Sequence, residues 1–319
     1  MKRIVALTMT LMMLLMMTAC GGAAPADDGK YTIGICQLVT HDALDAATKG
    51  FQDAVVAGLG EENVIFDIQN AAGDSNTCAS IANAFVAAEV DLILANATPA
   101  LQNAQAATAD IPILGTSVTE YGVALDIKDF TGTVGGNVSG TSDLAPLDEQ
   151  AAMLQAWFPD AKNVGLLYCS AEPNSKYQVD TIKALLEEKG YSCQMFAFAD
   201  SNDMPAVTNA ACEFADVIYV PTDNAVASST DIIDGICRPA GIPIIAGEEG
   251  ICAGCGVATL SISYYDLGYK TGEMAVQILK GEADIATMEI AYAPATPKYN
   301  AEICADLGLT APEGYVAIG

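Results

Sequence analysis

The chain has 319 residues, 40 of them acidic and 13 basic, and a formal net charge of −27. Nucleic-acid binding is excluded because no basic patch is available to neutralise phosphates. The single histidine, His41, excludes a catalytic dyad built on a second histidine. About 290 residues follow the first 30, which is enough for two lobes of ordinary domain size.

The N-terminus is predicted to be an export signal. Lys2 and Arg3 precede a mostly apolar stretch from Ile4 to Met17, and small residues follow up to Cys20. This order is typical of a secretory signal, and the segment around Cys20 resembles a bacterial lipobox. Residues 1–19 are then the signal peptide, Cys20 carries lipid, and residues 20–30 are a tether at the outer face of the cell membrane. An ordinary secretory signal with an incidental cysteine is the alternative.

Short apolar runs then alternate with helical patterns. In the first part of the chain, strands are predicted at residues 31–36, 63–69, 91–95 and 111–115, with helices from about residue 42, over 75–88 and over 145–158. The glycine-rich stretch Gly132–Gly140 is predicted to cross between lobes. In the second part, strands are predicted at 164–168, 192–198 and 257–262, with helices ending near 189 and spanning 204–214, 264–280 and 300–307.

Two segments repeat one pattern. Asp91–Gly115 and Asp216–Gly247 each read as an acidic start, an apolar strand, a polar turn, an amphipathic helix, Ile-Pro and a second strand. Such alternation indicates βαβ units and parallel sheet. The predicted fold class is therefore α/β, with two similar lobes, each a parallel sheet flanked by helices, joined by a hinge. Ligands bind outside the carboxyl ends of such strands, so we expect a binding cleft between the lobes.

The predicted boundaries follow from the same pattern. Lobe one covers residues 31–141, lobe two covers 142–262, the chain returns to lobe one over 263–283, and the tail 284–319 packs on lobe two.

Ten cysteines are present, and Cys20 is assigned to the lipid anchor. Three others lie in or beside apolar elements and are predicted to be core residues: Cys36, Cys78 and Cys169. Cys252 and Cys255 form a C-x-x-C motif near Cys237. Structural or disulfide roles are favoured for this motif; a metal site and a redox role remain as alternatives. We predict no metal and no cofactor.

Several stretches carry a family resemblance. They are Ile35–His41 with Ala43–Asp45, Ala97–Ala100, Val138–Asp143, Val220–Asn224, Ala246–Glu248, and Tyr264–Tyr265 with Leu267–Gly268 and Thr271–Ala275. Through them the chain resembles the substrate-binding lipoproteins of ABC importers, with the type I periplasmic-binding-protein fold, in the family that binds tryptophan, tyrosine or phenylalanine. The resemblance implies a free aromatic amino acid as ligand, and permease and ATPase subunits as partners.

Candidate ligand contacts follow from the chemistry of a free amino acid. Its carboxylate is expected to meet N–H groups or small hydroxyls at strand ends, from Thr98, Thr119, Ser170, Asn174 and Ser175. Its ammonium needs a carboxylate, and Asp223, flanked by Thr222 and Asn224, is the first candidate, with Glu248 in reserve. An N-cap role for Asp223 and a hinge or rim role for Glu248 are the alternatives.

Residues at the exit of the first strand are further candidates. Gln37, Leu38 and His41 lie there, although His41 also suits a helix start. Aromatic packing against the ligand is expected from Tyr121, Tyr177 or Tyr264, whereas Trp157 is predicted to be a core residue.

The sequence therefore predicts an extracytoplasmic substrate-binding lipoprotein and no enzymatic activity. Alternatives are a binding protein for another small polar ligand and a sensory or adhesive surface lipoprotein. An exported hydrolase is the least favoured, since no Gly-x-Ser-x-Gly motif is present.

Overall fold

The computed structural model describes residues 29–318, so the predicted signal peptide, most of the tether and Cys20 lie outside the described residues. The chain from Tyr31 onward forms one compact unit. Within residues 29–318, every helix is too short or too polar to cross a membrane.

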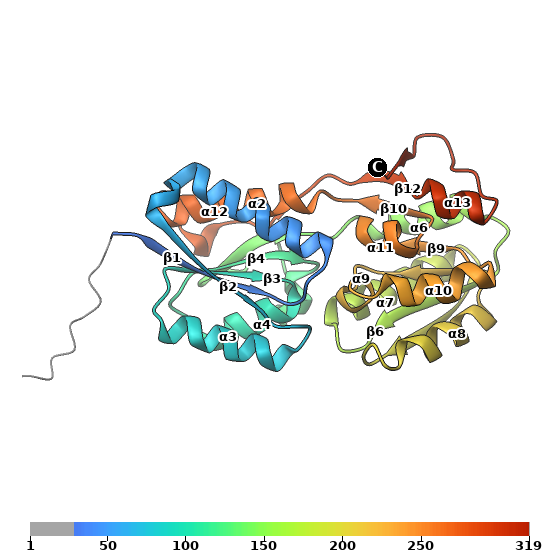
Figure 1. Ribbon diagram of the computed structural model, residues 1–319, viewed down its shortest axis with the longest axis horizontal. Helices are drawn as coiled ribbons and strands as arrows, with labels where there is room; N and C mark the ends of the chain where they lie inside the picture. Colours follow the sequence, from blue (N-terminus) through green and yellow to red (C-terminus); the bar gives the residue numbers. More distant parts are fainter. Residues whose placement is uncertain (1–28, 319) are drawn as a thin grey trace, which may run out of the picture. The chain divides into compact units, whose positions relative to one another are not determined.

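The first sheet has strand order β11-β5-β4-β3-β1-β2, with all neighbours parallel. Its strands are β1 (Tyr31–Gln37), β2 (Val64–Asn70), β3 (Leu92–Asn96), β4 (Ile113–Val118), β5 (Val138–Ser142) and β11 (Ala291–Tyr292). One face is covered by α2 (Asp42–Leu59) and α12 (Tyr264–Leu279), and the other by α3 (Ser75–Ala87) and α4 (Thr98–Ala107) (Figure 1). Short helices η1 (Glu61–Asn63), α5 (Tyr121–Ala124) and η2 (Ile285–Thr287) complete this lobe.

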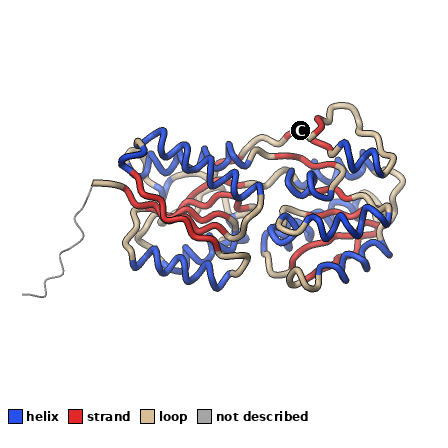
Figure 2. Tube along the Cα trace, in the orientation of Figure 1, coloured by secondary structure: helices blue, strands red, loops and turns tan. Residues whose placement is uncertain are grey.

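The second sheet has order β13-β12-β10-β9-β8-β6-β7. Its strands are β6 (Asn163–Cys169), β7 (Ser192–Phe198), β8 (Val217–Val220), β9 (Ile244–Ala246), β10 (Ala258–Ser261), β12 (Thr296–Tyr299) and β13 (Val316–Ala317), with β12 antiparallel to β10. One face packs on α6 (Leu147–Trp157), α7 (Pro173–Glu188) and α13 (Ala301–Asp306); the other packs on α8 (Met204–Phe214), α9 (Asn224–Ala227), α10 (Thr230–Ala240) and α11 (Glu249–Cys255). In both lobes the strands lie between helices (Figure 2), which confirms the predicted fold class.

The repeated segments have equivalent structures. β3, α4 and β4 form the first copy; β8, α9, α10 and β9 form the second, in which the helix is divided in two. The acidic start has the same role in each copy. Asp91 Oδ2 accepts a hydrogen bond from Thr32 N at 2.7 Å, and Asp216 Oδ2 accepts from Lys162 N and Asn163 N, both at 2.9 Å. Each carboxylate therefore fixes the start of the neighbouring strand.

The chain passes between the sheets three times, at residues 143–146, 262–263 and 293–295. The predicted crossing at Gly132–Gly140 is wrong, because Val138–Gly140 already pairs with β4. The tail also divides, since β11 pairs with β5 of the first sheet before β12, α13 and β13 join lobe two. A two-residue strand is too short to show a hydrophobic period, which is why the sequence did not reveal β11.

The return helix α12 is held to lobe one by close packing on α2. A Cβ atom on Gly268 would lie 1.9 Å from Ala47 O, and one on Gly50 would lie 2.1 Å from Tyr265 O. Only glycine permits the two backbones to approach this closely.

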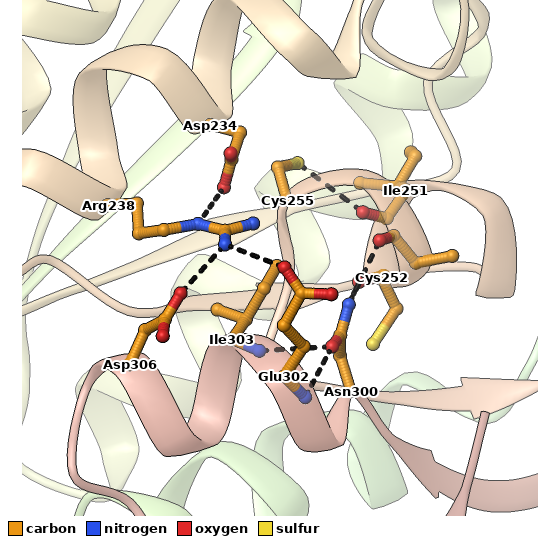
Figure 3. A network of polar contacts seen from close by, with 10 residues as sticks. Asp234, Arg238, Ile251, Cys252, Cys255, Asn300, Glu302, Ile303 and Asp306 are labelled. Carbon is orange, nitrogen blue, oxygen red and sulfur yellow. Dashed lines mark hydrogen bonds and ion pairs between the residues drawn. The ribbon is translucent and has the colours of Figure 1, made fainter.

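A polar network holds α13 against α10 and α11 (Figure 3). Arg238 donates to Asp234 at 2.8 Å, to Asp306 at 2.9 Å and to Glu302 at 3.3 Å. Asn300 caps α13 and donates to two carbonyl oxygens of α11. Exposed ion pairs stabilise little, so this network mainly fixes where the C-terminal segment lies.

The C-x-x-C motif lies within α11, and its two sulfur atoms do not point toward each other (Figure 3). Cys252 and Cys255 are buried free thiols, and Cys255 Sγ donates to Ile251 O at 3.4 Å. Within residues 29–318, no group of three or more His, Cys, Asp or Glu residues is placed so that it could hold a metal ion. A structural role agrees with this burial.

The other predicted core residues are buried as expected. Cys36, Cys78 and Cys169 are at most 3% exposed. Trp157 is 9% exposed and packs edge-on against Tyr315, with ring centroids 5.4 Å apart.

Candidate functional site

A cavity lies where the carboxyl ends of strands from both sheets meet. Lobe one contributes His41, Leu44, Ser117, Thr119, Asp143 and Tyr264; lobe two contributes Asn174, Thr222, Asp223, Asn224, Ala227 and Glu248. This inner cavity encloses about 10 Å³, room for roughly one water molecule. An outer cavity of about 320 Å³ shares Asn224 with it and includes apolar surface from Leu38, Val39, Pro99, Ala171 and Ala225.

The inner cavity is small because the lobes touch across it. His41 Nε2 lies 3.2 Å from Asn224 Oδ1, and Thr119 Oγ1 lies 3.4 Å from Thr222 Oγ1. Asn224 Nδ2 donates to Glu172 Oε2 at 2.7 Å, which leaves Oδ1 as the acceptor. His41 therefore donates its Nε2 proton. Burial lowers the pKa of His41 and so favours the neutral imidazole.

Asp143 directly follows β5 and has an unused oxygen. Tyr264 donates its hydroxyl to Asp143 Oδ2 at 2.9 Å, whereas Oδ1 makes no hydrogen bond of ordinary geometry within residues 29–318. Burial raises the pKa of Asp143, although hydroxyls of Tyr264 and Thr119 act in the opposite direction. A buried oxygen of this kind is costly unless something pairs with it.

Ser117, on the cavity wall beside Asp143, has two unusual features. Its Oγ has no partner within the described residues, and its φ of +53° lies in the left-handed region. Non-glycine residues held in this sparsely populated backbone region cluster at functional sites, so Ser117 is a further candidate contact.

Asn174 presents the equivalent free group in lobe two. Its Nδ2 donates to Thr222 O at 3.0 Å and to Glu172 Oε2 at 3.2 Å, which fixes the orientation of the amide. Its Oδ1 has no partner within the described residues. Glu172 lines the outer cavity, and it also accepts from the backbone N–H groups of Asn224 and Ala225. Burial, together with the charge of Asp223, raises the pKa of Glu172 to about 7.

Asp223 and Glu248 line the cavity but also cap helices. Asp223 accepts from Val226 N at 3.0 Å and from Cys169 N at 2.7 Å. Glu248 accepts from Gly250 N at 2.7 Å and from Ile251 N. Burial raises the pKa of both, for Glu248 to about 7. Each oxygen of the two carboxyls already accepts a backbone N–H, so the predicted N-cap alternative describes Asp223 in this structure.

The charge of the inner cavity is one-sided. Its walls carry Asp143, Asp223 and Glu248, Glu172 lines the adjoining outer cavity, and neither lysine nor arginine is among the residues that line the inner cavity. Such a wall favours a ligand with a cationic group. A ligand carboxylate would have to be received by hydroxyls, amides or the His41 N–H.

The predicted site residues separate into three groups. His41, Thr119, Asn174, Thr222, Asp223, Asn224 and Glu248 line the inner cavity, and Leu38 lines the outer one. Gln37, Thr98, Ser170 and Ser175 line neither. Gln37 forms hydrogen bonds with Asp45 and Thr48 inside lobe one. Ser170 donates its hydroxyl to Phe198 O, and the hydroxyl of Ser175 is a hydrogen-bond partner of the Asp223 carboxyl.

Among the predicted aromatic contacts, Tyr264 lines the inner cavity. Tyr121 is 1% exposed inside lobe one and donates to Thr141 O, and Tyr177 is half-buried against the core of lobe two. Sequence reasoning missed Asp143, Ser117 and Glu172. Glu172 comes shortly after the predicted strand 164–168, and this position was the signal that would have identified it, whereas Asp143 directly follows β5, which the sequence did not reveal as a strand.

The profile of the ABC transporter substrate binding protein family matches residues 32–315. The chain belongs to this family, whose members bind substrates outside the cytoplasm rather than convert them. The tyrosine-binding protein of Clostridioides difficile (strain R20291) is 38% identical over 280 residues, covering 84% of this chain and 81% of that protein.

Two solved structures bear on the conformation. The ABC domain from Streptococcus pneumonia in complex with L-Trp is 33% identical and has a TM-score of 0.85, covering 91% of this chain and 100% of that chain. A ligand-free, open substrate-binding protein with adhesive properties from Clostridium difficile is 39% identical, but its TM-score is 0.68, with 90% and 99% coverage. The more similar sequence gives the poorer superposition, which agrees with lobes that are closed in this structure.

Proposed function

We propose that this protein captures a free aromatic amino acid between its lobes and delivers it to the permease and ATPase subunits of an ABC importer. The observation that carries the proposal concerns three residues that line the inner cavity, a site rich in carboxyl groups. Each has a buried polar atom without a partner among the described residues: Asp143 Oδ1, Asn174 Oδ1 and Ser117 Oγ. The similarity to a tyrosine-binding protein and to an L-Trp complex supports an aromatic ligand.

The ammonium group is assigned to Asp143 and Asn174. Both present an unused buried oxygen, one from each lobe, so a cation between them draws the lobes together. Asp223, the first candidate from sequence, is less suited because both of its oxygens already accept backbone N–H groups. The carboxylate assigned to the ammonium is therefore that of Asp143, which follows β5, in place of that of Asp223, which follows β8.

The ligand carboxylate is assigned to the hydroxyls of Ser117, Thr119 and Thr222 and to the Nε2 proton of His41. The aromatic ring is assigned to the outer cavity, which offers Leu38 and Val39 as apolar surface. The inner cavity holds about 10 Å³, so the ligand enters by separating the lobes and replaces contacts between them.

The mature protein is proposed to be anchored by lipid on Cys20, with residues 1–19 removed and residues 20–30 as tether. The lipid on Cys20 then holds the two lobes at the outer face of the membrane, near the permease.

Calorimetric titration with a panel of free amino acids and small polar compounds tests the ligand class. Tyrosine, tryptophan or phenylalanine is expected to bind more tightly than aliphatic amino acids, and N-acetylation of the ligand is expected to abolish binding. Preference for a sugar or another uncharged polar compound would contradict the proposal.

A further inference from the structure

Two thiols in lobe two lie close enough to react with each other. Cys212, near the end of α8, and Cys237, on α10, have sulfur atoms 3.5 Å apart. A disulfide bond is about 2.05 Å long, so the sulfurs need to approach by only about 1.5 Å. Both are free thiols in this structure.

The two sulfurs differ in access and reactivity. Cys212 is partly exposed, whereas Cys237 is 1% exposed. The hydrogen bond with Cys237 lowers the pKa of the Cys212 thiol, while the same contact and burial raise the pKa of Cys237. A partly exposed thiol in contact with a buried partner thiol is the arrangement of an attacking and a resolving cysteine.

Other thiols of the described residues lack this combination. Cys36 and Cys78 also contact each other, but both are at most 1% exposed inside lobe one. Cys193 is partly exposed, but burial and the charge of Glu187 raise the pKa of its thiol to about 11.

We propose that Cys212 and Cys237 are a site of reversible disulfide formation, oxidised by an external low-molecular-weight disulfide outside the cytoplasm. The Cys212 thiolate attacks one sulfur of the external disulfide, breaks its S–S bond and releases one thiolate. Cys237 loses its proton, attacks Cys212 Sγ and releases the second thiolate. The two cysteines lose two electrons, and the external disulfide becomes two thiols, which take up the two protons.

The bond would close a loop that carries part of the binding site. Residues 213–236 lie between the two cysteines and include β8, Thr222, Asp223, Asn224 and α9. A cross-link that restricts this segment in the unfolded chain is expected to stabilise the folded protein.

The test treats the full protein with glutathione disulfide, caps remaining thiols with N-ethylmaleimide in denaturant, and maps peptides without reduction. We expect a Cys212–Cys237 cross-linked peptide about 2 Da lighter than the two thiol peptides together, and a melting temperature that falls by roughly 5 °C on reduction. Cys193→Ser is the matched control and should leave both results unchanged.

Two variants separate the roles of the two sulfurs. Cys237→Ala should trap a glutathione adduct on Cys212, since the resolving thiol is gone. Cys212→Ser should give neither a cross-link nor an adduct on the buried Cys237. Absence of the cross-link in the folded wild-type protein, or an adduct on Cys237 in Cys212→Ser, would overturn the proposal.

Discussion

The imidazole of His41 and the side-chain amide of Asn224 meet across the two lobes, with Nε2 3.2 Å from Oδ1. Glu172 fixes the direction of this contact by accepting from Asn224 Nδ2 at 2.7 Å. Glu172 takes no part in the contact between His41 and Asn224, but its bond to Nδ2 determines that the Oδ1 atom of Asn224 faces the other lobe. A hydrogen-bond chain of three side chains is therefore one of the contacts that join the closed lobes, beside that of Thr119 with Thr222.

Replacing His41 with alanine removes the Nε2 proton, which is donated to Asn224 in this structure and is assigned to the ligand carboxylate in the complex. One hydrogen bond contributes about 1 kcal/mol, so ligand affinity should fall by about 5-fold, mainly through faster dissociation. Stopped-flow release of a bound aromatic amino acid measures the effect. Thr40→Ala is the control, because Thr40 lies one residue away and contacts Asn70 of its own lobe; equal effects of the two variants would argue against the assignment of His41 Nε2 to the ligand carboxylate.

Asp143→Asn tests the assignment of the ammonium. Asparagine keeps the size and can still accept the Tyr264 hydroxyl, but the charge is lost. Removing one partner of a buried charge pair costs about 2–5 kcal/mol, which is about 30-fold to several thousand-fold in affinity. The loss, measured by calorimetry, should be large for the amino acid and small for its deaminated propionic-acid analogue.

Asp223→Asn is the matched comparison. Its carboxylate accepts from Cys169 N and Val226 N, so this change should lower the melting temperature and weaken both ligands alike. A loss confined to the amino acid would return the ammonium to Asp223.

The stability of the ligand-free protein should depend on pH through two buried carboxyls. Burial raises the pKa of Glu172 and Glu248 from 4.5 to about 7. Such groups stabilise the folded state fully below the unfolded pKa, and this contribution is lost as pH rises through the folded value. The free energy of unfolding should therefore fall between about pH 4.5 and pH 7, by at most on the order of 3 kcal/mol per group. Denaturant titrations of the wild type and of Glu248→Gln, which cannot ionise, measure it; parallel curves would contradict the account.

Anchoring gives a prediction outside the binding site. Cys20→Ala should release the protein from membranes and leave ligand affinity unchanged, because the lipid would be attached to the tether rather than to the lobes. Detergent-phase partitioning of cell extracts measures this. A variant that still partitions with membranes would show that the lipobox interpretation is wrong.

The sequence predicted most strands and helices because each lobe buries both faces of a parallel sheet, and continuous apolar runs such as residues 92–95 mark buried strands clearly. It also placed much of the cavity lining, since ligands gather at strand ends. The order of the candidate carboxyls is what the structure changes in the proposal. Asp223 and Asp143 both follow strands, and only the structure distinguishes the one whose oxygens serve backbone N–H groups from the one with an unused oxygen.

The strand β5 was not predicted from the sequence, for a different reason. β5 contains Gly140, whose φ of +146° and contact with Gly115 leave no room for a side chain, so its sequence reads as a glycine-rich loop. The crossing between the lobes was therefore predicted at Gly132–Gly140 instead of at residues 143–146, and Asp143 was not recognised as the residue that follows a strand.

A crystal structure of the complex with the tightest-binding aromatic amino acid tests the central claim most directly. The account predicts the ligand between the lobes, with its amino nitrogen within hydrogen-bond distance of Asp143 Oδ1 and Asn174 Oδ1 and its ring toward Leu38 and Val39. An amino nitrogen bound instead to Asp223 or Glu248, or a ligand outside the cleft, would contradict it.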